Sequence, residues 1–338
     1  MLPPRVALGS FPTPCEPAHD LGRVLGVDGL WVKRDDLIGH SWGGNKVRTI
    51  EFLLGDALQQ RADTVVLSGG TSSNFAALMA VACAQHGVSV HQVSYGHPPV
   101  VVPTAMAIGQ RCDTTYHFTG SLDRTAMEPA AQVVAQRLRE AGRRPYVLPR
   151  GGATPVGACG YALAAGELSQ QLVQAGIDAA TVVVPVGSGG TVAGLVAGWS
   201  QALGLAGPSV RIELIGVSVS RPAHELQPDV ERTVADWARL VGRVPAPRWG
   251  WELLDGRGSG FGATDAEDLA LVERIERDTR FLVDTTYNGK ALRWLRDHAA
   301  ELAQPVVYWH TGGIFGVIDR LFTSDAAMPA SRHFTRTP

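Results

Sequence analysis

The chain has 338 residues, of which 45% are hydrophobic and 18% charged, and its formal net charge is −2. This composition is typical of a globular protein of two domains or one large α/β unit, and it excludes the basic surface that nucleic acid or an anionic membrane would require. Prolines interrupt the N-terminal stretch where a signal peptide would be apolar. The four cysteines are irregularly spaced, which favours neither a disulfide framework nor a zinc site. We expect a cytoplasmic protein with reduced thiols and no bound metal.

Short apolar runs alternate along the chain with glycine-rich turns and amphipathic segments. Residues 30–37 alternate in polarity like a strand, and a helix is predicted to begin at Lys46. Strand, turn and helix follow each other again over 64–87, 144–172 and 181–203. Residues 221–264 are poorly patterned, and we expect loops and irregular structure there. The alternation predicts parallel sheets covered by helices on both faces, with sites at the carboxyl ends of the strands.

The strongest candidate site is the sequence VVVPVGSGGTVAGL at 182–195. Its glycines allow backbone N–H groups to approach an anion closely, its hydroxyls add donors, and a predicted helix begins at the same point. A tight turn with glycines used only for packing is the alternative. The residues concerned are Gly187, Ser188, Gly189, Gly190 and Thr191.

A second polar turn, SGGTSSNF at 68–75, also lies where a helix is predicted to begin. Its Ser72, Ser73 and Asn74 are typical of helix N-caps, and this interpretation is favoured when the turn is considered alone. Alternatively, the hydroxyl groups, the amide and the helix N-terminus together would bind a substrate carboxylate.

Lysine is rare in this chain, which has three lysines against 27 arginines. Lys46 follows two glycines and opens a predicted helix, where a positive charge is disfavoured. Unlike a guanidinium, a lysine amine readily changes its pKa on burial and condenses with an aldehyde to form a Schiff base. Lys33, in a predicted strand, and Lys290, in a predicted helix, have simpler structural explanations.

Taken together, these stretches resemble the fold type II pyridoxal-phosphate enzymes, and most of all the family of D-cysteine desulfhydrase and 1-aminocyclopropane-1-carboxylate (ACC) deaminase. The motifs WVKRDDL, GGNKVR, SSNF, GSGGTVAGL, ELIGVSVSR, YNGKA and HTGG occur in this order from residue 31 to about 316. The resemblance implies a two-domain α/β fold like that of tryptophan synthase β, with pyridoxal 5′-phosphate between the domains. The large domain would comprise 1–48 and 159–338, the small domain 49–158, and the protein would be a homodimer.

The same resemblance assigns roles to individual residues. Lys46 would form the Schiff base with the cofactor and act as the base at the substrate Cα. Asn74 would contact the 3′-oxygen of the cofactor, and Ser73 would hold the substrate carboxylate. The cofactor phosphate would lie in the loop 187–191. Tyr287 would assist the leaving group.

The chain also departs from the family pattern. Thr311 matches the desulfhydrases and would approach the pyridine nitrogen, while Asn288 stands where the deaminases have a glutamate. Phe261 replaces a second active-site tyrosine, and Phe75 replaces a polar residue of the usual QSN[HQ] motif. We expect Ser72 to Phe75, Phe261 and Tyr287 to face the substrate, which would be larger or more apolar than in the relatives.

These residues predict a pyridoxal-phosphate-dependent lyase that acts on a small amino acid by α-proton abstraction and β-elimination. The aminoacrylate would become an α-keto acid and ammonia. A neutral Thr311 hydroxyl at the ring nitrogen favours early loss of a β-leaving group over transamination. The alternatives are a β-replacement synthase of the cysteine-synthase kind, ring opening as in ACC deaminase, and a non-catalytic nucleotide or amino-acid binding protein, against which Lys46 argues.

Overall fold

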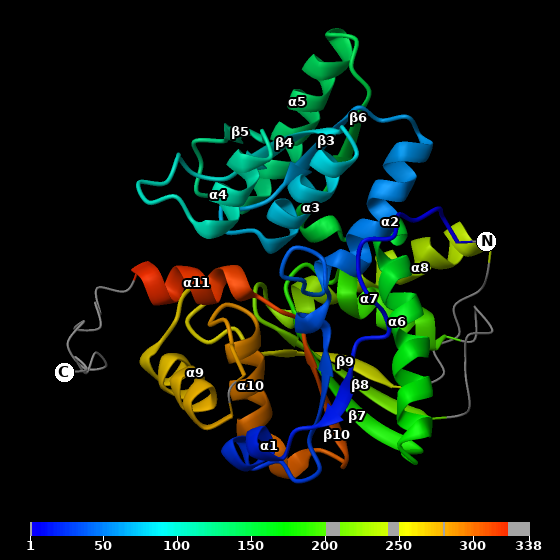
Figure 1. The fold of residues 1–338 in the computed structure, drawn as a ribbon, viewed down its shortest axis with the longest axis vertical. Coiled ribbons are helices and arrows are strands. Elements are labelled where there is room, and N and C mark those ends of the chain that lie inside the picture. The colour runs from blue at the N-terminus through cyan, green and yellow to red at the C-terminus, as the bar shows by residue number, and fades with distance from the viewer. Residues whose placement is uncertain (1, 201–209, 243–249, 280, 324–338) are drawn as a thin grey trace, which may run out of the picture.

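The computed structural model describes residues 2–200, 210–242, 250–279 and 281–323, and two sheets organise this part of the chain (Figure 1). The six-stranded sheet has the order β1-β2-β10-β7-β8-β9, and the four-stranded sheet has the order β5-β4-β3-β6. Every strand pair of the described residues is parallel except β1 with β2. The predicted alternation of helices and parallel strands is therefore confirmed.

The strands are β1 (Cys15–Pro17), β2 (Trp31–Arg34), β3 (Thr64–Ser68), β4 (Ser89–Ser94), β5 (Thr115–Phe118), β6 (Pro145–Leu148), β7 (Ala179–Val186), β8 (Arg211–Ser218), β9 (Trp251–Asp255) and β10 (Val306–His310). The α-helices are α1 (His19–Leu25), α2 (Lys46–Gln59), α3 (Asn74–Gln85), α4 (Thr104–Arg111), α5 (Met127–Glu140), α6 (Pro155–Gln174), α7 (Gly190–Trp199), α8 (Ala223–Val241), α9 (Ala266–Thr279), α10 (Asn288–Asp297) and α11 (Ile314–Thr323). Short 3-10 turns are η1 (Asp35–Leu37), η2 (Arg124–Ala126), η3 (Arg150–Gly152) and η5 (Ala299–Glu301). Within the described ranges, none of these helices combines the length and the apolar character that crossing a membrane requires.

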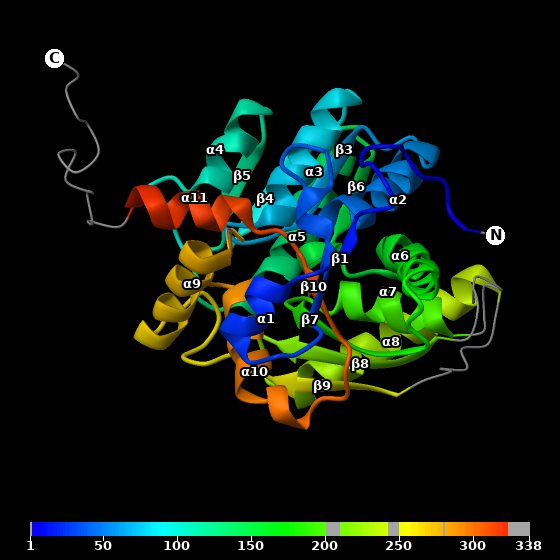
Figure 2. The ribbon, with the colours of Figure 1, turned by 60° about the horizontal axis from the view of Figure 1, so that its bottom comes forward.

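Helices cover both faces of the six-stranded sheet (Figure 2). Side chains of α6, α7 and α8 pack on one face, and those of α1, α9 and α10 pack on the other. The central strand β7 lies between two cores, which explains why its sequence is continuously apolar. Val182 and Val184 point to the first core and Val183 to the second, because successive side chains of a strand point to opposite faces.

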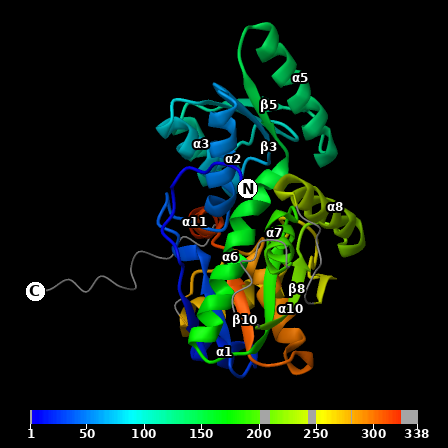
Figure 3. The ribbon, with the colours of Figure 1, turned by 90° about the vertical axis from the view of Figure 1, so that its right-hand side faces the viewer.

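The four-stranded sheet lies above the larger one in Figures 1 and 3 and is covered in the same way. Val65 and Leu67 of β3 pack with α2 and α3, whereas Val66 packs with α5. The C-terminal helix α11 lies between the two parts, and its Asp319 accepts hydrogen bonds from Thr104 N and Oγ1 at 2.8 and 2.5 Å. The boundary of the small domain at residues 49 and 158 stays a prediction.

The prediction of irregular structure over 221–264 is wrong for much of that stretch. Helix α8 occupies 223–241 and strand β9 occupies 251–255, while 243–249 lie outside the described residues. The helix contains Pro228, which lacks a backbone N–H, and many charged residues, and both features obscured its pattern. Its buried face nevertheless has regular helical spacing, with Ala223, Leu226, Val230, Val234, Trp237, Ala238 and Val241.

Candidate active site

A cavity of about 790 Å³ opens where β3, β7 and β10 end. Its walls come from the turns that follow these strands and from the start of α2, so residues far apart in sequence meet there. Its size is typical of a site for a cofactor together with a small substrate. The predicted site residues that line it are Lys46, Ser72, Ser73, Asn74, Phe75, Gly187, Ser188, Gly189, Thr191, Phe261, Tyr287 and Thr311.

Lys46 is the first residue of α2, and its side chain lines the cavity. The glycines before it are required by packing, because a Cβ atom on Gly43 would lie 2.2 Å from Ile38 O, and one on Gly44 would lie 3.0 Å from Thr311 O. Asn45 Nδ2 donates to Thr191 Oγ1 at 3.0 Å, which ties the start of α2 to the glycine-rich loop. Burial lowers the pKa of Lys46 to about 8, so a substantial fraction of the amine is neutral near pH 8.

The loop 187–191 joins β7 to α7 and has the features of an anion cradle. Ser188 Oγ is buried and has no hydrogen-bond partner among the described residues. Gly189 has φ +90°, and the first turn of α7 leaves backbone N–H groups without partners within the helix. Gly190 does not line the cavity but packs against Ala153. An unpaired hydroxyl beside free N–H groups fits the phosphate of pyridoxal 5′-phosphate.

Gly151 lies close both to Ser188 in the loop 187–191 and to Lys46. A Cβ atom built there would lie 2.5 Å from Ser188 Oγ and 3.8 Å from Lys46 Nζ, and the residue has φ +64°. We expect Gly151→Ala to weaken cofactor binding at least about tenfold, because the methyl group displaces a cradle donor. Titration of the apoprotein with pyridoxal phosphate, followed by absorbance, measures this.

The matched control is Gly142→Ala, because Gly142 has φ +78° but its Cβ atom would meet nothing within 4 Å. It therefore carries the same backbone strain without crowding the cavity. Equal cofactor affinity in the two variants would show that a methyl group at position 151 does not disturb cofactor binding.

The turn before α3 forms the predicted helix cap and also lines the cavity. Ser73 is the N-cap and its Oγ accepts a hydrogen bond from Ala76 N at 3.2 Å, so the predicted cap is present. Its hydroxyl proton remains available, and the neighbouring Ser72 is exposed at the cavity. Asn74 is half-buried and also faces the cavity. Phe75 also borders the cavity, but its side chain is 1% exposed and packs in the core of the small sheet.

Tyr287 and Phe261 also meet at the cavity wall, with ring centroids 5.9 Å apart and an edge-on geometry. Burial, reinforced by Asp284, raises the pKa of Tyr287 to about 12, so this hydroxyl keeps its proton at neutral pH. The guanidinium of Arg124 lies over the Phe261 ring, 4.0 Å from its centroid. This part of the cavity wall therefore holds a cation beside its aromatic rings.

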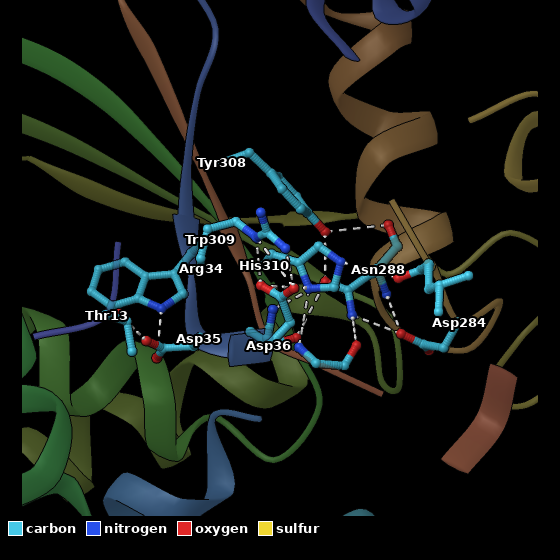
Figure 4. A network of polar contacts seen from close by, with 12 residues as sticks. Thr13, Arg34, Asp35, Asp36, Asp284, Asn288, Tyr308, Trp309 and His310 are labelled. Atoms are coloured by element: carbon cyan, nitrogen blue, oxygen red, sulfur yellow. Dashed lines mark hydrogen bonds and ion pairs between the residues drawn. The ribbon is translucent and has the colours of Figure 1, made fainter. Parts of the chain in front are cut away.

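Asn288 is buried and forms part of a polar network (Figure 4). Its Nδ2 donates to Asp284 Oδ2 at 2.7 Å and to Gly312 O at 2.8 Å, and its Oδ1 accepts from Tyr308 OH at 2.9 Å. Thr311 N and Oγ1 also donate to Oδ1, at 3.2 and 3.3 Å. The amide is thus fully used in hydrogen bonding and supplies no acidic proton.

His310 belongs to the structural side of the same network. Gly312 N donates to its Nδ1 at 3.2 Å, its Nε2 lies 3.2 Å from Leu282 O, and Asp36 Oδ1 lies 3.7 Å from Nδ1. His310 does not line the cavity. Its position agrees with hydrogen-bonded packing, which is the usual role of a lone buried histidine.

A buried charge cluster anchors α2 through Arg48, and the sequence analysis did not predict it. Its members are Lys33, Asp35, Arg48 and Glu167. Asp35 Oδ1 and Oδ2 accept from Arg48 of α2 at 2.9 and 3.0 Å, and Trp309 Nε1 donates to Oδ2 at 2.8 Å (Figure 4 shows Asp35 and Trp309). Arg48 also donates to Glu167 at 2.8 and 3.0 Å. Lys33 is completely buried and pairs with Glu167, so it is an internal cation rather than a residue of alternating strand polarity.

Several further cavity residues escaped the sequence analysis: Asn45, Tyr95, Arg124, Arg150 and Asp284. Asp284 accepts from Tyr287 N and Asn288 N at 2.6 and 3.2 Å, which fixes the turn that carries both residues. An aspartate shortly before a helix start is a recognisable signal of such a cap. Arg124 has no comparable local signal.

Comparison with known proteins agrees with this geometry. Residues 6–312 match the family described as pyridoxal-phosphate dependent enzyme. A putative 1-aminocyclopropane-1-carboxylate deaminase of Pyrococcus abyssi is 35% identical over 323 residues, which cover 93% of each chain. A D-cysteine desulfhydrase of Klebsiella pneumoniae is 34% identical over 326 residues, which cover 92% of this chain and 94% of the relative.

Solved structures of similar proteins have the same fold as this chain. The crystal structure of an ACC deaminase homologue matches with a TM-score of 0.83 at 32% identity and covers 93% of both chains. Threonine deaminase isoform 2 of Solanum lycopersicum shares the fold, with a TM-score of 0.61 at 16% identity over 90% of this chain and 80% of its own. The resemblance, the α/β fold and the cofactor inferred from the sequence are confirmed, and the chain belongs to the pyridoxal-phosphate-dependent enzymes.

Proposed function

We propose that the protein is a lyase that removes the α-proton and a β-substituent from a small amino acid, releasing an α-keto acid and ammonia. The observation that carries this proposal is the Lys46 amine, whose pKa of about 8 suits proton transfer near neutral pH. The amine lies in the same cavity as Ser188 of the loop 187–191 and the polar turn from Ser72 to Asn74. Relatives named as a deaminase and a desulfhydrase support the same reaction class.

Each residue has a defined part in this proposal. The Ser188 loop would hold the cofactor phosphate, and Ser73 with the N-terminus of α3 would hold the substrate carboxylate. Bound pyridoxal phosphate would delocalise the electron pair left at Cα. The neutral Lys46 amine would take the α-proton, the β-substituent would leave with its bonding electrons, and Cα and Cβ would become doubly bonded. Tyr287, protonated at neutral pH, would donate a proton to the departing group.

Ring opening of ACC is the less favoured reaction. Phe261 has no hydroxyl group, and the Asn288 amide is occupied by Asp284, Gly312 and Tyr308. Neither residue supplies the acid or base at those positions that the deaminase pattern implies. We therefore propose that β-elimination is the reaction of this site.

Turnover of D-cysteine and ACC by the holoenzyme tests the proposal. We expect D-cysteine to yield sulfide and pyruvate in equal amounts, and ACC to yield 2-oxobutanoate at least about 100-fold more slowly, the size of effect typical of a missing acid or base. Faster turnover of ACC would contradict the assignment. Product formation only with an added nucleophile would identify a β-replacement synthase instead.

We further propose that the protein is cytoplasmic and homodimeric. All four cysteines are free thiols in the described residues. Burial raises the pKa of Cys83 and of Cys159 to about 12, so both are unreactive packing residues. The homodimer rests on the family resemblance.

A further inference from the structure

Arg124 lies at the junction between the two halves of the cavity. It begins η2, just before α5 in the upper part of Figure 1, whereas Phe261 follows β9 in the lower part. The guanidinium carbon lies over the Phe261 ring, 4.0 Å from its centroid, so the ring forms a platform for the cation. The platform itself is tethered, because Lys290 Nζ donates to the carbonyl oxygens of Arg257, at 2.7 Å, and of Gly260.

Arg124 has no anionic partner in the part of the chain that the structure describes. Its Nε is buried and makes no hydrogen bond. The adjacent Asp123 is directed elsewhere, since its Oδ1 accepts from Thr125 N and from Thr125 Oγ1, both at 2.8 Å. Burial, and then the nearby charge of Arg150, lowers the pKa of Arg124. A buried guanidinium donor without an acceptor is costly, and an anionic ligand would remove that cost.

The other arginines of the cavity wall are already paired. Arg150 Nε lies 2.6 Å from Glu128 Oε1, and Arg221 Nη2 lies 2.7 Å from Asp229 Oδ2, an aspartate that also pairs with Arg232. Among the described cavity residues, Arg124 is therefore the arginine whose guanidinium has no carboxylate partner and can bind a ligand anion. Its neighbours are Phe261 and the phenol groups of Tyr95 and Tyr287, on the side where the substrate is expected.

We propose that Arg124 is a specificity residue that binds an oxyanion on the side chain of the substrate. This inference rests on the proposed function, and it selects amino acids whose β-substituent carries a carboxylate or a phosphate. A guanidinium presents its N–H donors in a planar fork that matches both groups. With a β-phosphate, Lys46 would take the α-proton, the Cβ–O bond would break, and phosphate would leave with the electron pair.

Binding of unreactive analogues tests the inference independently of turnover. The holoenzyme is titrated by calorimetry with racemic 2-methylaspartate and with its neutral isostere 2-methylasparagine, neither of which has an α-proton. We expect the acid to bind at least about tenfold more tightly in the wild type and about equally in Arg124→Gln. Arg124→Lys should keep part of the preference, because the charge stays while the fork is lost. Arg139→Gln, an exposed residue at the end of α5, is the charge-matched control.

The outcomes separate the possible roles of Arg124. Equal weakening of both analogues in Arg124→Gln would mean that the residue only shapes the site, and a loss of pyridoxal-phosphate affinity would assign it to the cofactor; either result overturns the inference. Phe261→Leu should lower the preference without abolishing it, because the platform is lost but the charge remains.

Turnover distinguishes phosphate from carboxylate and separates this inference from the proposed function. O-phosphoserine and O-acetylserine, each as a racemate, both yield pyruvate on elimination. A preference for the phosphate ester that disappears in Arg124→Gln would identify phosphate as the substrate group. If the wild type prefers 2-methylaspartate over 2-methylasparagine but does not prefer O-phosphoserine over O-acetylserine, the substrate group that Arg124 binds is a carboxylate. Absence of any elimination, with the binding preference intact, would overturn the proposed reaction and leave Arg124 as an oxyanion-binding residue.

Discussion

Replacing Lys46 with alanine should lower the rate of elimination at least about 1,000-fold and abolish covalent attachment of the cofactor, because the chain loses both the amine and the base. Borohydride reduction of the holoenzyme, followed by peptide mapping, checks the attachment. Only three lysines can carry the label. Lys33 is paired with Glu167 and Lys290 donates to backbone carbonyls, so label is expected on the Lys46 peptide alone.

Lys46→Arg is the matched control, because it keeps a positive charge but cannot condense with an aldehyde. We expect it to be as inactive as the alanine variant. Substantial activity in either variant, or label on Lys33 or Lys290, would show that another amine carries the cofactor.

The pKa of Lys46 also predicts how the apoprotein depends on pH. The folded-state pKa is about 8, and an unfolded lysine has a pKa of about 10.4, so the unfolded chain binds more protons between these values. Burial of Lys46 therefore destabilises the apoprotein most below pH 8, and this cost disappears as the pH approaches 10.4. Lys46→Met should be more stable than the wild type at pH 7, with a difference that narrows by pH 10. Urea unfolding of both apoproteins at the two pH values measures this.

The second large effect is expected at Asp35, which holds the charge cluster under α2. Asp35→Asn should lower the free energy of unfolding by about 3–5 kcal/mol, because it removes the completely buried one of the two carboxylates that pair with the buried Arg48. Burial by itself would raise the pKa of Asp35, but Arg48 outweighs it and holds the pKa below its usual value, so the native group is ionised. Arg48 lies two residues after Lys46 on α2, and cofactor affinity should fall as well.

Asp63→Asn is the matched control for this variant. Asp63 pairs with the exposed Arg143 at 3.0 Å, and an exposed pair contributes at most about 1 kcal/mol. Urea unfolding monitored by circular dichroism compares the two variants. Losses of similar size would mean that the buried cluster contributes no more than a surface ion pair.

Local patterns were sufficient to single out two segments that line the cavity. Lys46 was recognisable because an amine stands alone at a predicted helix start, and 187–191 because glycines and hydroxyls coincide with a strand–helix turn. These features depend on residues that are neighbours in the chain. The same applies to most strands and helices, whose periodic apolar residues reflect the face that each element buries. Helix α8 has this periodicity too, although Pro228 and the many charged residues obscure it.

The order of motifs along the chain also placed the protein in its family, with pyridoxal phosphate as the cofactor, and the comparisons confirm this. By itself, therefore, the sequence determined the fold class and the cofactor, and it predicts that Lys46 carries the cofactor. Only the tertiary structure decided which distant side chains meet. Trp309 donates to Asp35 because β10 lies beside β2 in the larger sheet, and Arg124 meets Phe261 because the segments after β5 and β9, which belong to different sheets, line the same cavity. Such contacts depend on strand order, which no local pattern specifies.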